Sequence, residues 1–357
     1  MFLWHRLQKE KRPILIYGMG NGSEKLLELA RFYTVPIAGI FASQDHSREG
    51  LVFQGYPVMA YDKALRDYPD SVILVAFGVY QEEVLARIQS LSQTHSVFVP
   101  DIPLMGGSAL TPTYLREHRA EISQSRGLLS DEKSFRVFDS MLEAKLTGEI
   151  PAYFQEDTPR QEDMELLHLG SKEQYLDLGA YNGDTIFEFL SLTGGVYSSI
   201  DAFEPDSHNL KKLAESTAQL SRLTIHQQAS WNESTTLTFS GKGGRNCAKL
   251  PQLPGQYKHL HPVEAIPVDL LHQDFTYIKM DVEGAEEETL FGMAETLNRC
   301  HPKLLISAYH KPDDFITLPL LVEQLCPGYR MYLRRNRCLP AWEIQLYCVH
   351  PENTKNS

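Results

Sequence analysis

Glycines and an acid lie together in the segment Asp177-Leu178-Gly179-Ala180-Tyr181-Asn182-Gly183-Asp184-Thr185, between a strand-like run and a helical pattern. Gly179 and Gly183 allow a sharp turn and a close approach of the backbone to a ligand, where a Cβ would collide. Tyr181 stands where NAD-binding loops carry their middle glycine. Because Asp177 would repel a diphosphate but attract an amino group, the segment predicts a site for S-adenosyl-L-methionine. We expect Ala180, Asp184 and Thr185 to belong to the same cofactor site.

A second acid follows the next strand-like run, in Phe203-Glu204-Pro205-Asp206. Nucleotide sites of this kind place a carboxylate there to accept hydrogen bonds from the ribose hydroxyls. We therefore expect Glu204 and Pro205 to bind the cofactor. The alternative is that Glu204 only caps the following helix.

The third segment, Tyr277 to Glu286, is a strand that ends in a cluster of acids. Ligands bind beyond the carboxyl ends of parallel strands, so Asp281 and Glu283 should face the same crevice as Gly179. Their negative charge would attract a sulfonium. The alternative for Glu283 is a favourable charge at the N-terminus of the next helix, which is the expected role of residues 286–288.

Transfer of a methyl group to a hydroxyl needs a positioned acceptor and benefits from a base. His310 ends the strand KLLISAYH and is the predicted base, with Asp281 as the second catalytic residue. The predicted substrate contacts are Tyr309, Lys311, Arg334 and Glu343. Asp281 and His310 could ligate a metal, but no spaced set of ligands demands one, so we expect none.

The elements that must position these residues predict an α/β protein with two doubly wound, Rossmann-like domains. RPILIYGMGNGSEKLLELARFY and EQYLDLGAYNGDTIFEFLSL each read as a strand, a glycine turn and a helix. We expect a first domain over 1–105, a helical connector over 106–168 and a second domain over 169–357. The second domain is expected to contain seven strands, in the segments YLDLG, SIDAFEP, LTIHQQA, TYIKMDV, KLLISAYH, GYRMYLRR and WEIQLYCV. Ser130-Asp131 and Gly148 with Pro151 mark the start and stop of a helix in the connector. The Gly-rich stretch 231–272 reads as an irregular insertion or a β-hairpin.

LDLGAYNGDT, AFEPD, YIKMDVEGAE, SAYHKPDDF and MYLRRNRCLPAWEIQLYCV together resemble the FkbM-type methyltransferases over 174–349. The resemblance implies a class I methyltransferase fold and O-methylation of sugar or polyketide hydroxyls. Many relatives carry paired histidines where this chain has Arg335 and Asn336, so the substrate stays open.

The N-terminal turn Gly18-Met19-Gly20-Asn21-Gly22 follows a strand and precedes a helix, as phosphate-binding turns do. Its second strand, IAGIFAS, ends without the ribose acid. GMGNG, FQGYPV and VILVAFG loosely resemble the N-terminal domain of PglD-type sugar acetyltransferases. We leave open whether this domain binds a nucleotide or nucleotide-sugar or serves only as a scaffold.

Composition limits the classes of function and partner that remain. The net charge of −12 disfavours nucleic acid as a partner, and no apolar run is long enough to span a membrane. The five cysteines form no C-x-x-C pair, and the basic start does not read as a secretory signal. We therefore expect a cytoplasmic protein. A homo-oligomer is possible. Two alternatives to a methyltransferase remain: a non-catalytic nucleotide- or sugar-binding protein, and an NAD-dependent oxidoreductase that uses the N-terminal turn.

Overall fold

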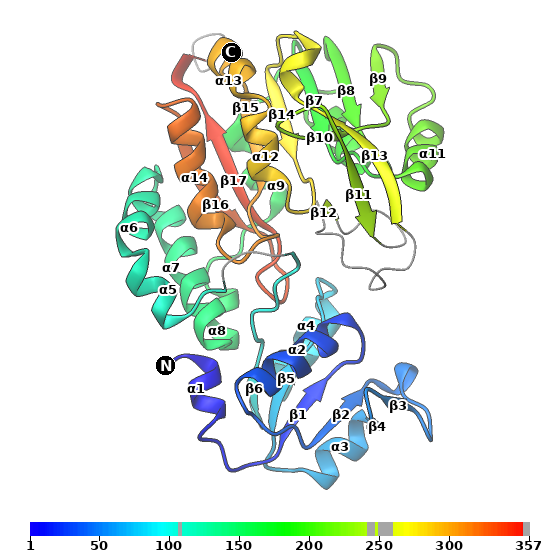
Figure 1. The fold of residues 1–357 in the computed structure, drawn as a ribbon, viewed down its shortest axis with the longest axis vertical. Coiled ribbons are helices and arrows are strands. Elements are labelled where there is room, and N and C mark those ends of the chain that lie inside the picture. The colour runs from blue at the N-terminus through cyan, green and yellow to red at the C-terminus, as the bar shows by residue number, and fades with distance from the viewer. Residues whose placement is uncertain (106–108, 241–246, 249–259, 353–357) are drawn as a thin grey trace.

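The computed structural model describes residues 1–105, 109–240, 247–248 and 260–352, and consists of two α/β units with helices between them (Figure 1). Within these residues, no helix combines the length and the apolar content that crossing a bilayer requires.

The N-terminal unit is a six-stranded sheet in the order β3-β4-β2-β1-β5-β6. All neighbouring strands are parallel except the short β3, which pairs antiparallel with β4. Every residue of β1 and β5 is buried, as expected for parallel strands covered on both faces. The strands are β1 (Ile14–Tyr17), β2 (Gly39–Ala42), β3 (Val52–Phe53), β4 (Tyr56–Ala60), β5 (Val72–Val75) and β6 (Ser96–Phe98), and the helices are α1 (Leu3–Leu7), α2 (Asn21–Phe32), α3 (Tyr61–Asp67) and α4 (Glu82–Leu91).

Five helices connect the two units: α5 (Pro112–Glu117), α6 (Arg119–Leu128), α7 (Glu132–Thr147), α8 (Ile150–Phe154) and α9 (Arg160–Met164). Helix α7 begins after Asp131, whose carboxylate accepts a hydrogen bond from the Ser134 N–H at 2.8 Å, and ends at Gly148, which has φ +65°. The predicted start and stop of this helix are confirmed. Helices α5 to α8 lie to one side of the C-terminal sheet in Figure 1, where α7 packs against β16.

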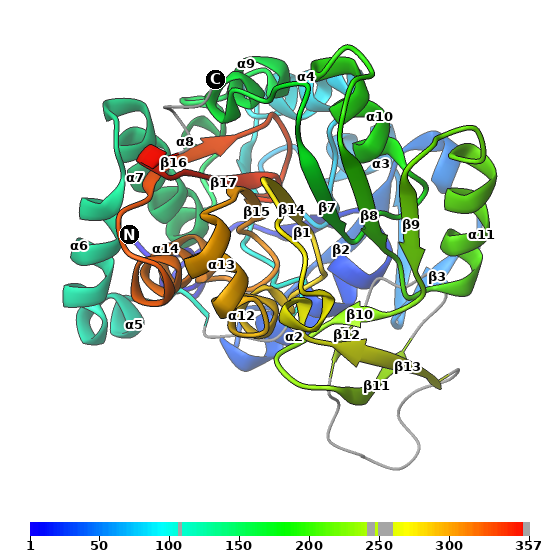
Figure 2. The same cartoon turned by 90° about the horizontal axis from the view of Figure 1, so that it is seen from above.

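The C-terminal unit is a seven-stranded sheet in the order β16-β17-β15-β14-β7-β8-β9, seen from above in Figure 2. Strand β17 runs antiparallel to both of its neighbours, and the other pairs are parallel. All seven predicted strands are present. The strands are β7 (Gln174–Leu178), β8 (Ser199–Phe203), β9 (Leu223–His226), β14 (Tyr277–Met280), β15 (Lys303–Ser307), β16 (Arg330–Arg335) and β17 (Ile344–Val349), and the helices are α10 (Asp184–Leu192), α11 (Ser207–Ser216), α12 (Glu286–Phe291), α13 (Ala294–Cys300) and α14 (Asp314–Leu325).

The stretch expected to be irregular or a hairpin forms most of a small second sheet. Its strands are β10 (Ala229–Ser230), β11 (Thr235–Ser240), β12 (Cys247–Ala248) and β13 (Leu260–Ile266). Strands β11 and β13 pair antiparallel, which agrees with the hairpin interpretation. Two parts of the predicted Gly-rich stretch, 241–246 and 249–259, lie outside the described residues, as does the predicted start of the connector at 106.

The two units meet at the carboxyl ends of their sheets. Val79, just past β5, exchanges two backbone hydrogen bonds with Leu339, at 2.7 and 2.9 Å. The Met105 N–H donates to the carbonyl of His310 at 3.1 Å. The N-terminal unit therefore lies directly against the loops where the site residues were expected.

Candidate functional site

A cavity of about 530 Å³ lies beyond the carboxyl ends of β7, β8 and β14. This is where a doubly wound sheet binds its ligands, because the strand ends and the helix N-termini open there. Eight of the predicted cofactor residues line it: Gly179, Tyr181, Asp184, Thr185, Glu204, Pro205, Asp281 and Glu283.

Gly179 and Gly183 hold the turn between β7 and α10. Gly179 has φ +84°, and a Cβ on it would lie 1.9 Å from the Asp281 carbonyl oxygen, so only glycine lets the ends of β7 and β14 come this close. Gly183 has φ +91° and donates its N–H to the Ala180 carbonyl at 2.8 Å. Ala180 is fully buried in the core. Gly183 and Ala180 therefore shape the turn without lining the cavity.

Asp177 lies behind the cavity wall, and its charge is paired. Its carboxylate lies 3.2 Å from Nζ of Lys279 and accepts a hydrogen bond from the Thr185 hydroxyl at 2.5 Å. Lys279 also donates to the Gly179 carbonyl at 2.8 Å. Burial lowers the pKa of Lys279, but the nearby carboxylates of Asp177 and Asp281 together raise it above its ordinary value, so the ammonium stays charged. Asp177 thus fixes Lys279 and the turn, and direct contact with the cofactor stays a prediction.

Glu204 follows β8 directly and is 5% exposed at the cavity wall. One carboxylate oxygen accepts the Tyr181 N–H at 2.9 Å and the other accepts the Asp206 N–H at 2.8 Å. Burial raises the pKa of Glu204 to about 7, although these backbone donors lower it. Asp206 caps α11 through its own carboxylate, so the cap assigned to Glu204 in the alternative interpretation belongs to Asp206.

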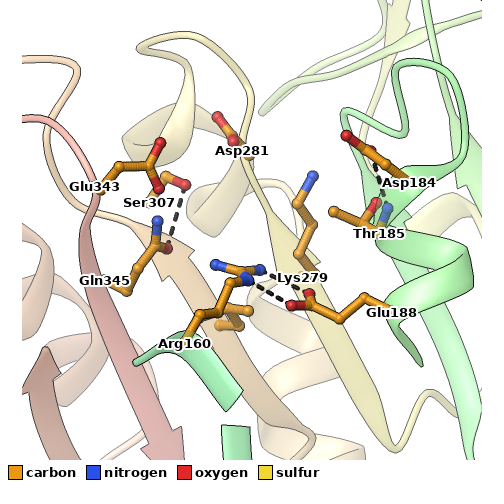
Figure 3. Close-up of a pocket in the computed structure, with 10 residues that line it drawn as sticks. Arg160, Asp184, Thr185, Glu188, Lys279, Asp281, Ser307, Glu343 and Gln345 are labelled. Atoms are coloured by element: carbon orange, nitrogen blue, oxygen red, sulfur yellow. Dashed lines mark hydrogen bonds and ion pairs between the residues drawn. The ribbon is translucent and has the colours of Figure 1, made fainter. Parts of the chain in front are cut away.

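A smaller cavity of about 270 Å³ continues from the first and shares Asp184, Thr185, Lys279, Asp281 and Glu343 with it. Figure 3 shows Arg160 and Glu188 facing each other at its base, joined by two hydrogen bonds of 2.6 and 2.9 Å. Ser307 and Gln345 complete its polar wall. The cavity therefore offers cations and anions close together, as a zwitterionic group requires.

His310 lines the large cavity and is 2% exposed. Its Nδ1 lies 2.9 Å from Glu286, and its Nε2 lies 3.4 Å from Asp281 and 3.8 Å from Glu283. Burial lowers its pKa, but these three carboxylates raise it to about 10. An imidazolium has no lone pair for a proton, so the predicted role of His310 as the base disagrees with this environment.

The four predicted substrate contacts divide into two pairs. Tyr309 and Glu343 line the large cavity. Arg334 does not, because its guanidinium is buried against Asp131 at 2.6 Å and fixes α7 to β16, so its assignment as a substrate contact is corrected. The ammonium of Lys311 forms an ion pair with Glu287 at 3.3 Å, and Lys311 lines neither cavity. Its assignment as a substrate contact is corrected for this reason.

Several lining residues were not predicted from the sequence. Tyr80 and Leu104 reach the large cavity from the N-terminal unit, and Trp342 reaches it from the loop before β17. Gln228 and Ser230 follow β9, and Arg160 comes from the connector. Of the lining residues that were missed, only Lys279 could have been noticed in the sequence, because it is a charged residue inside an apolar strand. The others reach the cavities only through contacts between distant segments.

The chain was compared with known proteins. Residues 177–338 match the family model of the Methyltransferase FkbM domain. No curated protein matches the chain. The crystal structure of Methyltransferase FkbM from Methylobacillus flagellatus KT is 21% identical with a TM-score of 0.70, covering 94% of this chain and 89% of that one, so the common fold includes the N-terminal unit.

More distant structures share part of the fold. An rRNA methylase from Streptococcus thermophilus has a TM-score of 0.35 at 13% identity, covering 54% of this chain and 97% of that one. Fibrillarin from Aeropyrum pernix, in complex with natively bound S-adenosyl-L-methionine, has a TM-score of 0.35 at 11% identity, covering 53% and 74%. Residues 177–338, which include most of the residues that line the two cavities, thus match the Methyltransferase FkbM domain.

Proposed function

We propose that this protein transfers the methyl group of S-adenosyl-L-methionine to a hydroxyl of a sugar, a glycan precursor or a related natural product. The observation that carries the proposal is one cavity that is lined both by the buried carboxylate of Glu204 and by aromatic side chains. When bound, the cofactor supplies a methyl group activated on a sulfonium sulfur. The chain's own residues bind the cofactor and the acceptor, orient them and exclude water.

The adenosine half of the cofactor fits the side of the cavity near β8 and β9. Glu204 is held by two backbone donors and keeps lone pairs for the two ribose hydroxyls. Pro205 and Ala229 offer apolar surface for a base, and Gln228 offers an amide beside them. A volume of about 530 Å³ suits a ligand of this size.

The methionine half fits the smaller cavity. Arg160 could hold the α-carboxylate there, while Asp184 and Glu188 lie in the same wall for the amino group. We propose Arg160 as the carboxylate ligand and Asp184 as an amino-group ligand, in place of Asp177.

The acceptor side is aromatic. Tyr80, Tyr309 and Trp342 line the cavity near Asp281, and flat aromatic faces stack on the apolar faces of sugar rings. Tyr80 is 74% exposed, which leaves its ring available to an incoming acceptor. We propose that 1–105 forms a domain that supplies this wall, and that 106–168 joins it to the methyltransferase domain of 169–357.

The proposal is tested by calorimetric titration of S-adenosylhomocysteine into the wild-type protein and into Glu204→Gln and Glu215→Gln. Glu215 is exposed on α11 and serves as the matched control. We expect micromolar affinity for the wild type and the control, and at least about tenfold weaker binding for Glu204→Gln, since a neutral amide loses a charge-assisted hydrogen bond. A folded wild type that does not bind would overturn the cofactor site and favour a non-catalytic protein.

The acceptor is tested separately, by screening hydroxylated sugars and nucleotide-sugars for methylation with labelled S-adenosyl-L-methionine. We expect methylation of a sugar hydroxyl. In Tyr80→Ala, we expect this activity to fall through a raised KM for the acceptor, while the affinity for S-adenosylhomocysteine stays unchanged. Transfer to a nitrogen or carbon acceptor instead would overturn the O-methylation part of the proposal.

A further inference from the structure

The imidazole of His310 is surrounded by carboxylates at the centre of the large cavity. Asp281 and Glu283 face its Nε2 from the loop after β14, and Glu286 faces its Nδ1 from the first turn of α12. Ligand atoms of Asp281, Glu286 and His310 all lie within 4.8 Å of one another. The cluster therefore places three carboxylates around one imidazole.

The polar atoms of the cluster are not satisfied by ordinary hydrogen bonds. The Glu286 side chain is 1% exposed, and its Oε2 has no hydrogen-bond partner in the described part of the chain. Nδ1 of His310 forms an ion pair with Glu286 at 2.9 Å, and this buried nitrogen has no hydrogen-bond partner among the described residues. Buried polar groups without partners are costly, and such groups commonly mark an ion or ligand that completes the site.

The distances on the cavity side suit a shared ion better than hydrogen bonds. Nε2 lies 3.4 Å from Asp281 and 3.8 Å from Glu283, beyond the usual N–H···O range of about 2.7–3.2 Å. Two ligands that share a metal ion at about 2.1 Å lie about 3.0–3.5 Å apart.

We propose that Asp281, Glu283 and His310 bind a divalent metal ion, with Mn²⁺ as the best-suited class, at the acceptor side of the cavity. Two carboxylates and an imidazole form a mixed oxygen and nitrogen ligand set, which suits such an ion. Glu286 lies behind the imidazole and acts as a positioning residue, since metal-binding histidines usually have a carboxylate at their other nitrogen. No metal was expected from the sequence, because Asp281 and His310 do not belong to a spaced set of ligands that demands one.

The use of this ion in catalysis rests on the proposed function, whereas the site itself does not. A bound divalent ion lowers the pKa of a coordinated hydroxyl. The acceptor hydroxyl would release its proton to solvent water, and its oxygen would then bond to the methyl carbon as the carbon–sulfur bond breaks and its electron pair stays on sulfur. The ion would thus activate the acceptor hydroxyl.

The test is titration of Mn²⁺ into the metal-free full chain, followed by calorimetry and by the electron paramagnetic resonance signal of free Mn²⁺. The variants are His310→Gln, Glu283→Gln and Glu286→Gln, with Glu287→Gln as the control on the same helix. We expect one ion per chain and at least about tenfold weaker binding in the first two variants. We expect a smaller loss in Glu286→Gln and none in the control.

Binding of S-adenosylhomocysteine is measured on the same samples to show that each variant is folded. Wild type that binds S-adenosylhomocysteine but takes up no Mn²⁺ would overturn the metal site and leave the proposed function standing. A second described cluster, His301, His350 and Glu352, could also attract the ion. Mn²⁺ binding that persists in His310→Gln and disappears in His350→Gln would likewise overturn the proposal.

Discussion

Gly78 lies so close to Trp342 that a Cβ built on it would be 1.8 Å from a carbon of the indole ring. Gly78 belongs to the N-terminal unit and Trp342 to the C-terminal unit, where it lines the large cavity. The hydrogen bonds between Val79 and Leu339 lie beside this contact. The wall of the cavity is therefore built at a tight contact between two units that are distant in sequence.

Replacement of Gly78 by alanine is expected to lower the free energy of unfolding by about 1–3 kcal/mol, the usual cost of overpacking. Thermal or denaturant unfolding measures this effect. Gly127→Ala is the control, because Gly127 lies in α6 with no atom within 4 Å of a built Cβ, and it should be neutral or slightly stabilising. Equal stability of the two variants would contradict a tight contact at Gly78.

The affinity for S-adenosylhomocysteine is expected to depend on pH through Glu204. Its pKa of about 7 lies above the ordinary value, so the carboxyl is protonated below pH 7 and ionised above it. The ionised form accepts hydrogen bonds from the ribose hydroxyls. The dissociation constant should therefore rise about tenfold for each unit by which the pH falls below 7, and it should be constant above pH 8. Calorimetry between pH 5.5 and about 8.5 measures this dependence. Glu204→Gln should bind weakly with a flat profile, and a steep profile in that variant would assign the titration to another group.

Arg160→Gln is expected to weaken binding of S-adenosylhomocysteine by at least about tenfold, since a charge-assisted pair to the α-carboxylate is lost. Methylthioadenosine, which has no amino-acid moiety, should bind the variant and the wild type equally. Competition binding with the two ligands measures the difference. If both ligands weaken alike, Arg160 acts on the fold through Glu188 and not on the carboxylate.

Arg334→Met is expected to destabilise the protein by about 3–5 kcal/mol, because it leaves the buried carboxylate of Asp163 and the half-buried carboxylate of Asp131 without their cation. At a temperature where the variant is still folded, the KM for the acceptor should equal that of the wild type. A raised KM with unchanged thermal stability would restore Arg334 as a substrate contact.

Local patterns were enough to predict much of the fold and part of the site. The seven strands, helix α7, the turn at Gly179 and the acid at Glu204 all depend on residues that are close in sequence, where strand alternation, caps and glycine conformations act. The same patterns could not reveal the ion pairs of Asp177 or Arg334. Those residues look like free charges in a motif, and only packing shows that Lys279 and Asp131 neutralise them.

By itself, the sequence determined which segments form strands, where the glycine turn of the cofactor site lies and where Glu204 lies. Each of these features is a short-range consequence of backbone geometry. The tertiary structure alone decided that Tyr80 from the N-terminal unit and Arg160 from the connector enter the cavities. It also decided that three carboxylates converge on His310 and raise its pKa. These features depend on contacts between segments far apart along the chain, and their energies arise only when burial removes the charges from water.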